Sequence, residues 1–98
     1  MQFLINAYDG PNMLEKRMAV RPRHLENMSK VKGKILCAGG RLDQDGHPVG
    51  SVMIFEFDSR ELLDEYLASE PYIVEKVWER VDVEAMNVVI LDGKKIGK

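Results

Sequence analysis

The stretch VGSVMIFEFD, Val49–Asp58, is the strongest strand pattern in the chain, and the segment that follows it decides the fold. Ser59 is a good N-cap residue, and Arg60–Ser69 places leucine and tyrosine side chains at helical spacing. Pro71 then breaks the helix, because proline has no backbone N–H and fixes its own φ. The pattern therefore predicts a strand, a capped amphipathic helix and a break, in that order.

The chain before this stretch predicts a strand and a kinked helix. Gln2–Tyr8 is an apolar run that ends at the turn cluster Asp9-Gly10-Pro11. Helix formers fill Met13–Val20, but Pro22 cannot continue that helix without a kink. A proline suits the first turn of a new helix, so we expect a second helical piece from Pro22 to about Lys32.

The inner edge of this second piece is expected at spacing three, on Leu25, Met28 and Val31. Gly33 is the expected C-terminal cap. Lys34–Gly39 is then predicted as a second strand, and the segment from Gly40 to Pro48 as a loop rich in turn residues.

The C-terminal part predicts a short helical piece and a last strand. We expect one or two helical turns in Ile73–Arg80, with inward side chains at Val74, Val77 and Trp78. Val81–Leu91 is expected to close the chain as a strand that is strongest from Met86 to Leu91. Asp92-Gly93 is a tight-turn pair, and Lys94–Lys98 after it is expected as a hairpin arm or a frayed tail.

The resulting order, β-α-β-β-α-β, predicts an α+β fold of the ferredoxin-like kind with a four-stranded antiparallel sheet. Two helices cover only one face of such a sheet. The strands look apolar on both faces, since Leu4 and Tyr8 alternate with Phe3, Ile5 and Ala7. A wet second face would alternate apolar and polar residues. We therefore expect a homodimer in which a second copy of the chain covers this face.

Composition limits the class of protein. The 98 residues fit one domain, expected at 1–91, with 92–98 as a tail. The net charge of −2 argues against nucleic acid and against an anionic membrane surface as partners. A single cysteine, Cys37, excludes an intrachain disulfide, and the chain opens without a signal-peptide pattern. These observations lead us to expect a cytoplasmic protein.

The segments Leu14-Glu15-Lys16-Arg17 and Val20-Arg21-Pro22-Arg23-His24-Leu25 closely resemble the N-terminal signature of the YciI-like, or YCII-related, family. Ala38-Gly39, Gly50-Ser51 and Glu70-Pro71-Tyr72 fall where that family has its other marks, so the resemblance runs to about Leu91. It implies a ferredoxin-like domain that dimerises through sheet faces into an α/β barrel. It also implies an enzyme, since relatives include a dehydrochlorinase of a chlorinated hydroxyhydroquinone and, in the wider barrel group, muconolactone isomerase.

His24 is the first candidate site residue, because a neutral imidazole takes up a proton near pH 7 and a carboxylate can orient it. The resemblance supplies two carboxylates for this purpose, Glu70 and Asp9. The family usually has aspartate where this chain has Glu70, so the carboxylate here reaches further by one methylene. Sequence alone leaves open which of the two carboxylates pairs with His24.

Three further residues are candidates for substrate binding. Arg21 suits an anionic or phenolate oxygen, or else a carboxylate such as Asp9. Ser51 offers a hydroxyl to a substrate oxygen or simply begins a strand, and Tyr72 is expected to pack on the sheet more than to touch a ligand. No metal site and no cofactor are expected, since Asp43-Gln44-Asp45-Gly46 lacks the other ligands of a calcium loop and His24, His47 and Cys37 have no zinc spacing.

These candidates predict a cofactor-free enzyme that transfers protons on a small cyclic or phenolic molecule, by elimination or isomerisation. In this prediction His24 is the general base or acid, Glu70 or Asp9 orients it, and Arg21 and Ser51 bind oxygen. The alternative is a dimeric module that binds a small molecule, or regulates, without catalysis.

Overall fold

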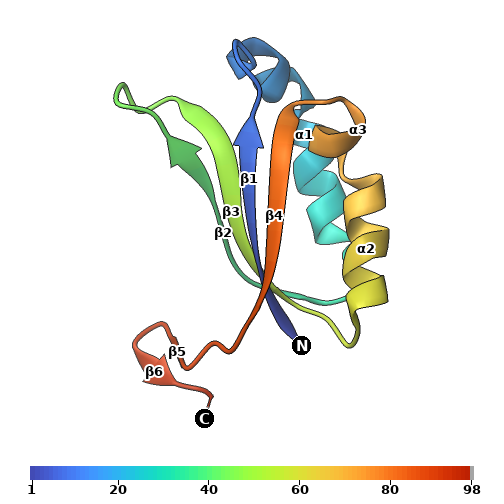
Figure 1. The fold of residues 1–98 in the computed structure, drawn as a ribbon, viewed down its shortest axis with the longest axis vertical. Helices are drawn as coiled ribbons and strands as arrows, with labels where there is room; N and C mark the ends of the chain where they lie inside the picture. The colour runs from blue at the N-terminus through green and yellow to red at the C-terminus, as the bar shows by residue number, and fades with distance from the viewer. Residues whose placement is uncertain (98) are drawn as a thin grey trace.

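The computed structural model describes residues 1–97 and shows the predicted α+β architecture (Figure 1). The four long strands are β1 (Gln2–Asp9), β2 (Lys34–Leu42), β3 (Pro48–Glu56) and β4 (Trp78–Met86). They form one antiparallel sheet in the order β2-β3-β1-β4. The helices are α1 (Leu14–Ser29), α2 (Arg60–Ser69) and the single turn α3 (Pro71–Val74). This order is that of a ferredoxin-like sheet, so the predicted fold class is confirmed.

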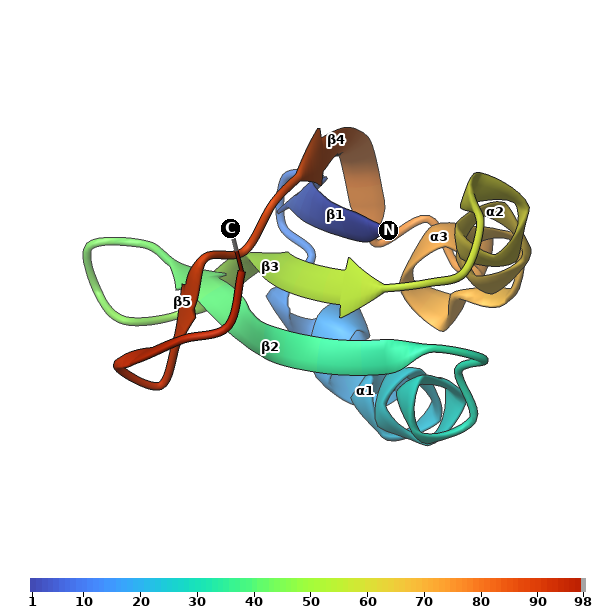
Figure 2. The same cartoon turned by 90° about the horizontal axis from the view of Figure 1, so that it is seen from below.

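The helices lie on one side of the sheet, where the core forms (Figures 1 and 2). Alternate residues of β1 and β3, and Phe57 directly after β3, point toward them and are almost fully buried: Phe3, Ile5, Ala7, Met53, Phe55 and Phe57. Leu63 and Tyr66 of α2 and Val20 and Met28 of α1 close the other side of this core. The period of two in the strands and of about four in the helices accounts for this layer.

Helix α1 runs through Pro22 without the break that we expected. Pro22 is exposed, and Met18, whose carbonyl loses its helical N–H partner, is 52% exposed, so the missing hydrogen bond lies on the solvent side of the helix. The helix ends at Ser29 with Lys30 as its C-cap, earlier than the predicted Lys32 and without a cap at Gly33. The inner edge also differs, because Leu25 is 46% exposed and His24 is buried beside it.

The segment after α2 is the largest departure from the sequence prediction. Helical structure stops at Val74, and Lys76 adopts a left-handed backbone with φ of 62° before the chain enters β4 at Trp78. Val74 is exposed, contrary to the prediction, whereas Val77 and Trp78 are buried as predicted. The true strand is therefore Trp78–Met86, in which Val81, Val83 and Ala85 alternate with charged residues.

This register changes the predicted second face of the sheet. Leu4 pairs with Glu84 in β4 and with Ile54 in β3, so these three side chains share the face away from the helices. Arg80, Asp82 and Asn6 lie on the same face. The face thus carries an apolar strip with a charged border along β4, and the prediction that every strand is apolar on both sides is wrong for β4.

Beyond β4 the chain leaves the sheet. Ile90–Leu91 (β5) pairs with Lys94–Lys95 (β6) around the Asp92-Gly93 turn, in a small hairpin beyond the end of the sheet (Figures 1 and 2). The predicted strand Val81–Leu91 is therefore correct only as far as Met86, and the part expected to be strongest, from Met86 to Leu91, lies mostly outside the sheet, while the expected turn is present. Lys98, the last residue of the predicted tail, lies outside the described residues. Within residues 1–97, no helix has the length and hydrophobicity that crossing a bilayer requires.

Candidate functional site

The candidate site lies where the buried face of α1 meets α3 and the end of α2. Four α1 side chains point inward at spacings of three or four: Arg17, Val20, His24 and Met28. Two of these four are polar, which is uncommon for a face packed on a sheet. Each polar member meets a carboxylate from another part of the chain, so α1 builds two buried pairs of titratable or charged side chains.

The first pair joins His24 to Glu70, as one of the two open alternatives predicted. His24 Nδ1 lies 2.6 Å from Glu70 Oε1, and the Glu70 side chain is fully buried. The chain between α2 and α3 explains how a carboxylate comes to lie there. Glu70 is both the last cap of α2 and the N-cap of α3, where Pro71 occupies the first helical position.

Glu70 receives hydrogen bonds on both of its oxygens. The Tyr72 backbone N–H donates to Oε1 at 3.1 Å, and the Tyr66 hydroxyl donates to Oε2. Burial and the charge of Glu70 raise the pKa of the Tyr66 phenol, which therefore stays protonated. The pair is thus embedded in donors, as a buried carboxylate requires.

Aromatic rings hold the imidazole in place. The Tyr72 ring stacks on His24 with centroids 4.2 Å apart, and the Trp78 ring meets it edge-on at 6.0 Å. Tyr72 is buried, as expected, and its pKa is raised by burial against the lowering effect of Arg17 and Arg21. With Nδ1 bound to Glu70 and the ring clamped, Nε2 is the nitrogen left for a molecule in the adjoining pocket.

The second pair joins Arg17 to Asp9, and it removes Asp9 as the partner of His24. Arg17 Nη1 donates to Asp9 Oδ1 at 2.8 Å, and Nη2 donates to Ser51 Oγ at 2.9 Å. The Arg17 guanidinium also lies 4.6 Å from the centre of the Tyr72 ring. The alternative that Arg21 pairs with Asp9 is therefore wrong, since Arg17 occupies that place.

Asp9 is less completely satisfied than Glu70. Its side chain is only 3% exposed, and Oδ2 is buried without a hydrogen-bond partner among the described residues. Burial raises the pKa of the Asp9 carboxyl, and the nearby Arg17 charge only partly opposes that effect.

A pocket of about 180 Å³ opens beside the His24 pair. Its lining brings together most of the predicted site residues: His24, Arg21, Ser51 and Tyr72, with Arg17, Leu25, Met28, Met53 and the β2 segment Ala38–Gly40. Ser51 is buried in the wall, Arg21 is exposed at the rim, and Tyr72 both packs and lines the pocket. Glu70 stands behind His24, and Asp9 stands behind Arg17.

The prediction missed Arg17 and Tyr66. Arg17 precedes His24 by two helical turns and so shares its face, a spacing that would have pointed to it. Tyr66 precedes Glu70 by one turn of α2 in the same way. These helical spacings did not predict either residue, because a charged helix residue is usually exposed and an aromatic one usually packs in the core.

Fold and site together define a ferredoxin-like α+β domain with a buried histidine–carboxylate pair at the wall of a small pocket. The chain belongs to the family of the YCII-related domain, which matches residues 1–87. It is 33% identical to Protein YciI of Escherichia coli O6:H1 (strain CFT073) over 97 residues, which cover 91% of this chain and 99% of that protein. Aspercryptin biosynthesis cluster protein B of Emericella nidulans is 32% identical over 87 residues, 80% of this chain and 56% of that protein.

Solved structures agree with the fold. The chain resembles 5-chloro-2-hydroxyhydroquinone dehydrochlorinase from Burkholderia phenoliruptrix AC1100, solved in complex with 2,5-dihydroxybenzoquinone, with a TM-score of 0.79 and 26% identity. That match covers 88% of this chain and 93% of the other. An antibiotic biosynthesis monooxygenase shares the fold, with a TM-score of 0.59 and 19% identity over 91% of this chain and 98% of the other.

Proposed function

We propose that the protein is a small cofactor-free enzyme that moves protons on a small cyclic or phenolic substrate, giving elimination or isomerisation. The observation that carries this proposal is the His24 ring, which has one nitrogen held by a buried carboxylate while the ring lines a pocket. A histidine arranged in this way is a general base with a defined tautomer. Isomerisation needs one proton moved between two atoms, and elimination needs a proton and a leaving group removed.

In this proposal His24 takes the proton at Nε2, and Glu70 stabilises the imidazolium that forms. The Glu70 side chain is fully buried, so its interaction with the imidazolium is less screened than at the surface. Tyr72 and Trp78 fix the ring plane from two directions. A base held in this way loses little orientation freedom when the substrate arrives.

The charges around the pocket favour a substrate with one negative oxygen. The Arg17 charge is matched by Asp9 at 2.8 Å, whereas no ion pair is formed by Arg21 within residues 1–97. Arg21 lies one helical turn before His24, and both line the pocket. An anionic or phenolate oxygen bound by Arg21 thus places the rest of a small ring next to Nε2.

The relatives support this chemistry. The dehydrochlorinase acts on a hydroxylated chlorinated ring, and its solved complex holds a dihydroxybenzoquinone. The pocket volume of about 180 Å³ fits one six-membered ring with a few substituents. A ring of this class would bring an acidic proton, an anionic oxygen and, in the chlorinated case, a leaving group.

Turnover of 5-chloro-2-hydroxyhydroquinone, followed by chloride release, tests the proposal, with further hydroxyquinols and lactones as a panel. The unmodified chain is expected to turn over at least one member. His24→Gln is expected to lower kcat/KM about 100- to 10,000-fold, the usual contribution of a general base. His47→Gln, the matched control at the exposed second histidine, is expected to leave kcat/KM unchanged.

The alternative is a non-catalytic binding module, and the pocket lining gives it one observation. Apart from His24, no histidine and no cysteine line this pocket in the described part of the chain. Binding of a panel member by calorimetry, with no turnover and the same affinity in His24→Gln, would replace the enzyme proposal with this one.

We also propose that the protein is a homodimer through the face of the sheet that the helices leave open. Leu4, Val52 and Ile54 form its apolar strip and are half-buried in the single chain. Sedimentation velocity is expected to give the mass of a dimer, and Ile54→Glu the mass of a monomer. Glu61→Lys, on the exposed face of α2, is the control and is expected to remain dimeric. A monomeric unmodified chain at high concentration would contradict the proposal.

A further inference from the structure

Glu70 Oε2 depends on one side chain that the proposed mechanism does not use. Its donor is the Tyr66 hydroxyl, while Oε1 is shared by the Tyr72 N–H and by His24. We infer that Tyr66 is a positioning residue that acts through Glu70 to keep His24 Nε2 as the unprotonated nitrogen facing the pocket. This inference rests on the proposed function, because only a catalytic base needs a defined tautomer. The tautomer of His24 itself can be measured without a substrate.

Two states of a buried carboxyl group compete at this position. A fully buried carboxylate without donors favours taking up a proton, because burial disfavours the charged form. A protonated Glu70 would be able to donate to His24 Nδ1, which would move the imidazole proton to Nε2. Such a proton would sit on Oε1, which faces Nδ1, while the Tyr66 hydroxyl donates to the other oxygen, Oε2. The hydroxyl binds an ionised carboxylate more strongly than a neutral carboxyl group. It therefore favours the ionised, acceptor-only carboxylate.

The Tyr66 phenol stays protonated at neutral pH. Burial and the charge of Glu70 both raise the pKa of its phenol, so the hydroxyl keeps its proton and can only donate to the carboxylate. An ionised Glu70 that accepts on both oxygens also requires Nδ1 of His24 to carry hydrogen. In the neutral ring the lone pair then lies on Nε2, the nitrogen left for the pocket.

The position of the hydroxyl is fixed by its helix and by the core. Tyr66 and Glu70 are four residues apart on α2, so their side chains lie over one another on the same face. The Tyr66 ring packs edge-on against Phe55 at 5.0 Å and its hydroxyl lies 3.9 Å from the Met53 sulfur. The ring is thus anchored without help from Glu70, and Tyr66→Phe removes the hydroxyl while keeping the packing of the ring against Phe55.

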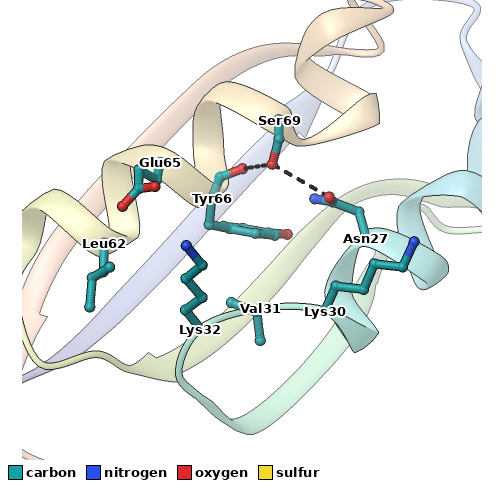
Figure 3. A pocket seen from close by; sticks show the side chains of 8 residues that line it. All are labelled: Asn27, Lys30, Val31, Lys32, Leu62, Glu65, Tyr66 and Ser69. Carbon is teal, nitrogen blue, oxygen red and sulfur yellow. Dashed lines mark hydrogen bonds between the residues drawn. The ribbon is translucent and has the colours of Figure 1, made fainter.

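The surroundings of Tyr66 supply a matched control. The other side of the ring lines a hollow of about 240 Å³ between α1 and α2, where Lys32 reaches toward Tyr66 (Figure 3). Ser69 lines the same hollow and also carries a hydroxyl. That hydroxyl donates to the Tyr66 backbone oxygen at 3.0 Å and lies 3.4 Å from Asn27 Oδ1. It makes no hydrogen bond to Glu70 within residues 1–97. Ser69→Ala therefore removes a hydroxyl from the same helix and hollow without touching the pair.

The test is nitrogen-15 NMR of the His24 ring, assigned by comparison with His47→Gln, at a pH above the titration of the ring. The unmodified chain and Ser69→Ala are expected to show one tautomer, with hydrogen on Nδ1. Tyr66→Phe is expected to show a mixture of both tautomers. A Tyr66→Phe spectrum identical to that of the unmodified chain would overturn the inference.

A second measurement covers the case in which Tyr66→Phe does not fold. In the unmodified chain the Tyr66 hydroxyl proton is expected as a slowly exchanging low-field resonance that disappears in Glu70→Gln. Its absence from the unmodified chain would also overturn the inference. Neither measurement uses a substrate. Absence of turnover would therefore contradict the proposed enzyme function without affecting the role of Tyr66, which these two measurements test separately.

Discussion

The buried face of α1 carries two side chains that pair with carboxylates, and the two pairs differ in kind. Arg17 with Asp9 joins a permanent cation to a carboxylate, and His24 with Glu70 joins a ring that gains and loses a proton to another carboxylate. The first pair leaves Asp9 Oδ2 without a hydrogen-bond partner within residues 1–97, whereas both oxygens of Glu70 accept hydrogen bonds. The arginine pair therefore joins strands and helix, and the histidine pair has the hydrogen-bond donors that the proposed proton transfer requires.

The largest expected effect is on stability, from breaking the arginine pair on one side. Arg17→Met leaves Asp9 buried beside no cation, and we expect the free energy of unfolding to fall by about 3–5 kcal/mol. Urea denaturation measures this. The double variant Arg17→Met, Asp9→Leu is expected to recover most of the loss, and a double variant as unstable as Arg17→Met would show that packing, and not charge, is what Arg17 supplies.

The next prediction separates the two carboxylates by their effect on His24. In Glu70→Gln the imidazolium loses its neighbouring charge, so the ring is expected to protonate at a lower pH than in the unmodified chain. The same change is expected to cost about 1.5–3 kcal/mol of stability, through weaker hydrogen bonds. NMR titration of His24 gives the midpoint. Asp9→Asn is expected to leave that midpoint in place, and a shift of equal size there would merge the two pairs into one network.

A smaller effect is expected at the hydroxyl that supports Arg17. Ser51→Ala removes the acceptor that binds Nη2 at 2.9 Å, and the expected loss is about 1 kcal/mol in the free energy of unfolding. Thermal unfolding checks it. Ser29→Ala, on the exposed end of α1, is the control and is expected to change little. A Ser51→Ala loss as large as that of Arg17→Met would make the serine an equal partner.

The smallest expected effect is a pH dependence that belongs to Asp9. Its pKa is raised in the folded chain above the ordinary value of 3.8, so folding favours the protonated form. This contribution to stability is present below pH 3.8 and is lost as the pH rises through the folded pKa. The stability of the unmodified chain relative to Asp9→Asn is therefore expected to decline with rising pH across that window. A relative stability that increases there would mean that Arg17 outweighs burial.

The sequence predicted the parts of the fold that depend on local signals. Arg60–Ser69 was predicted to the residue, because Ser59 caps its start and Pro71 follows its end. The error near the C-terminus has a physical cause: the apolar run from Met86 to Leu91 outweighed the alternation of Val81, Val83 and Ala85, which marks the true strand. No local sequence pattern predicts the left-handed backbone of Lys76, two residues before β4 begins at Trp78.

The site divides in the same way. His24 and Glu70 are 46 positions apart, so no local pattern relates them, and the resemblance to a family supplied the pairing as one of two options. Arg17 was overlooked because an arginine on a helix is normally solvated, and only the fold places Asp9 beside it. A buried ion pair is thus predictable from a sequence only when both of its residues are already known to lie close together.

Trp78 gives the molecule an optical property. It is the single tryptophan of the chain, and the centre of its ring lies 6.0 Å from the centre of the His24 ring. A protonated imidazole at that range quenches indole emission more strongly than a neutral one does. The intrinsic fluorescence of the protein, followed against pH or added ligand, therefore reads out the proton on His24 without any label.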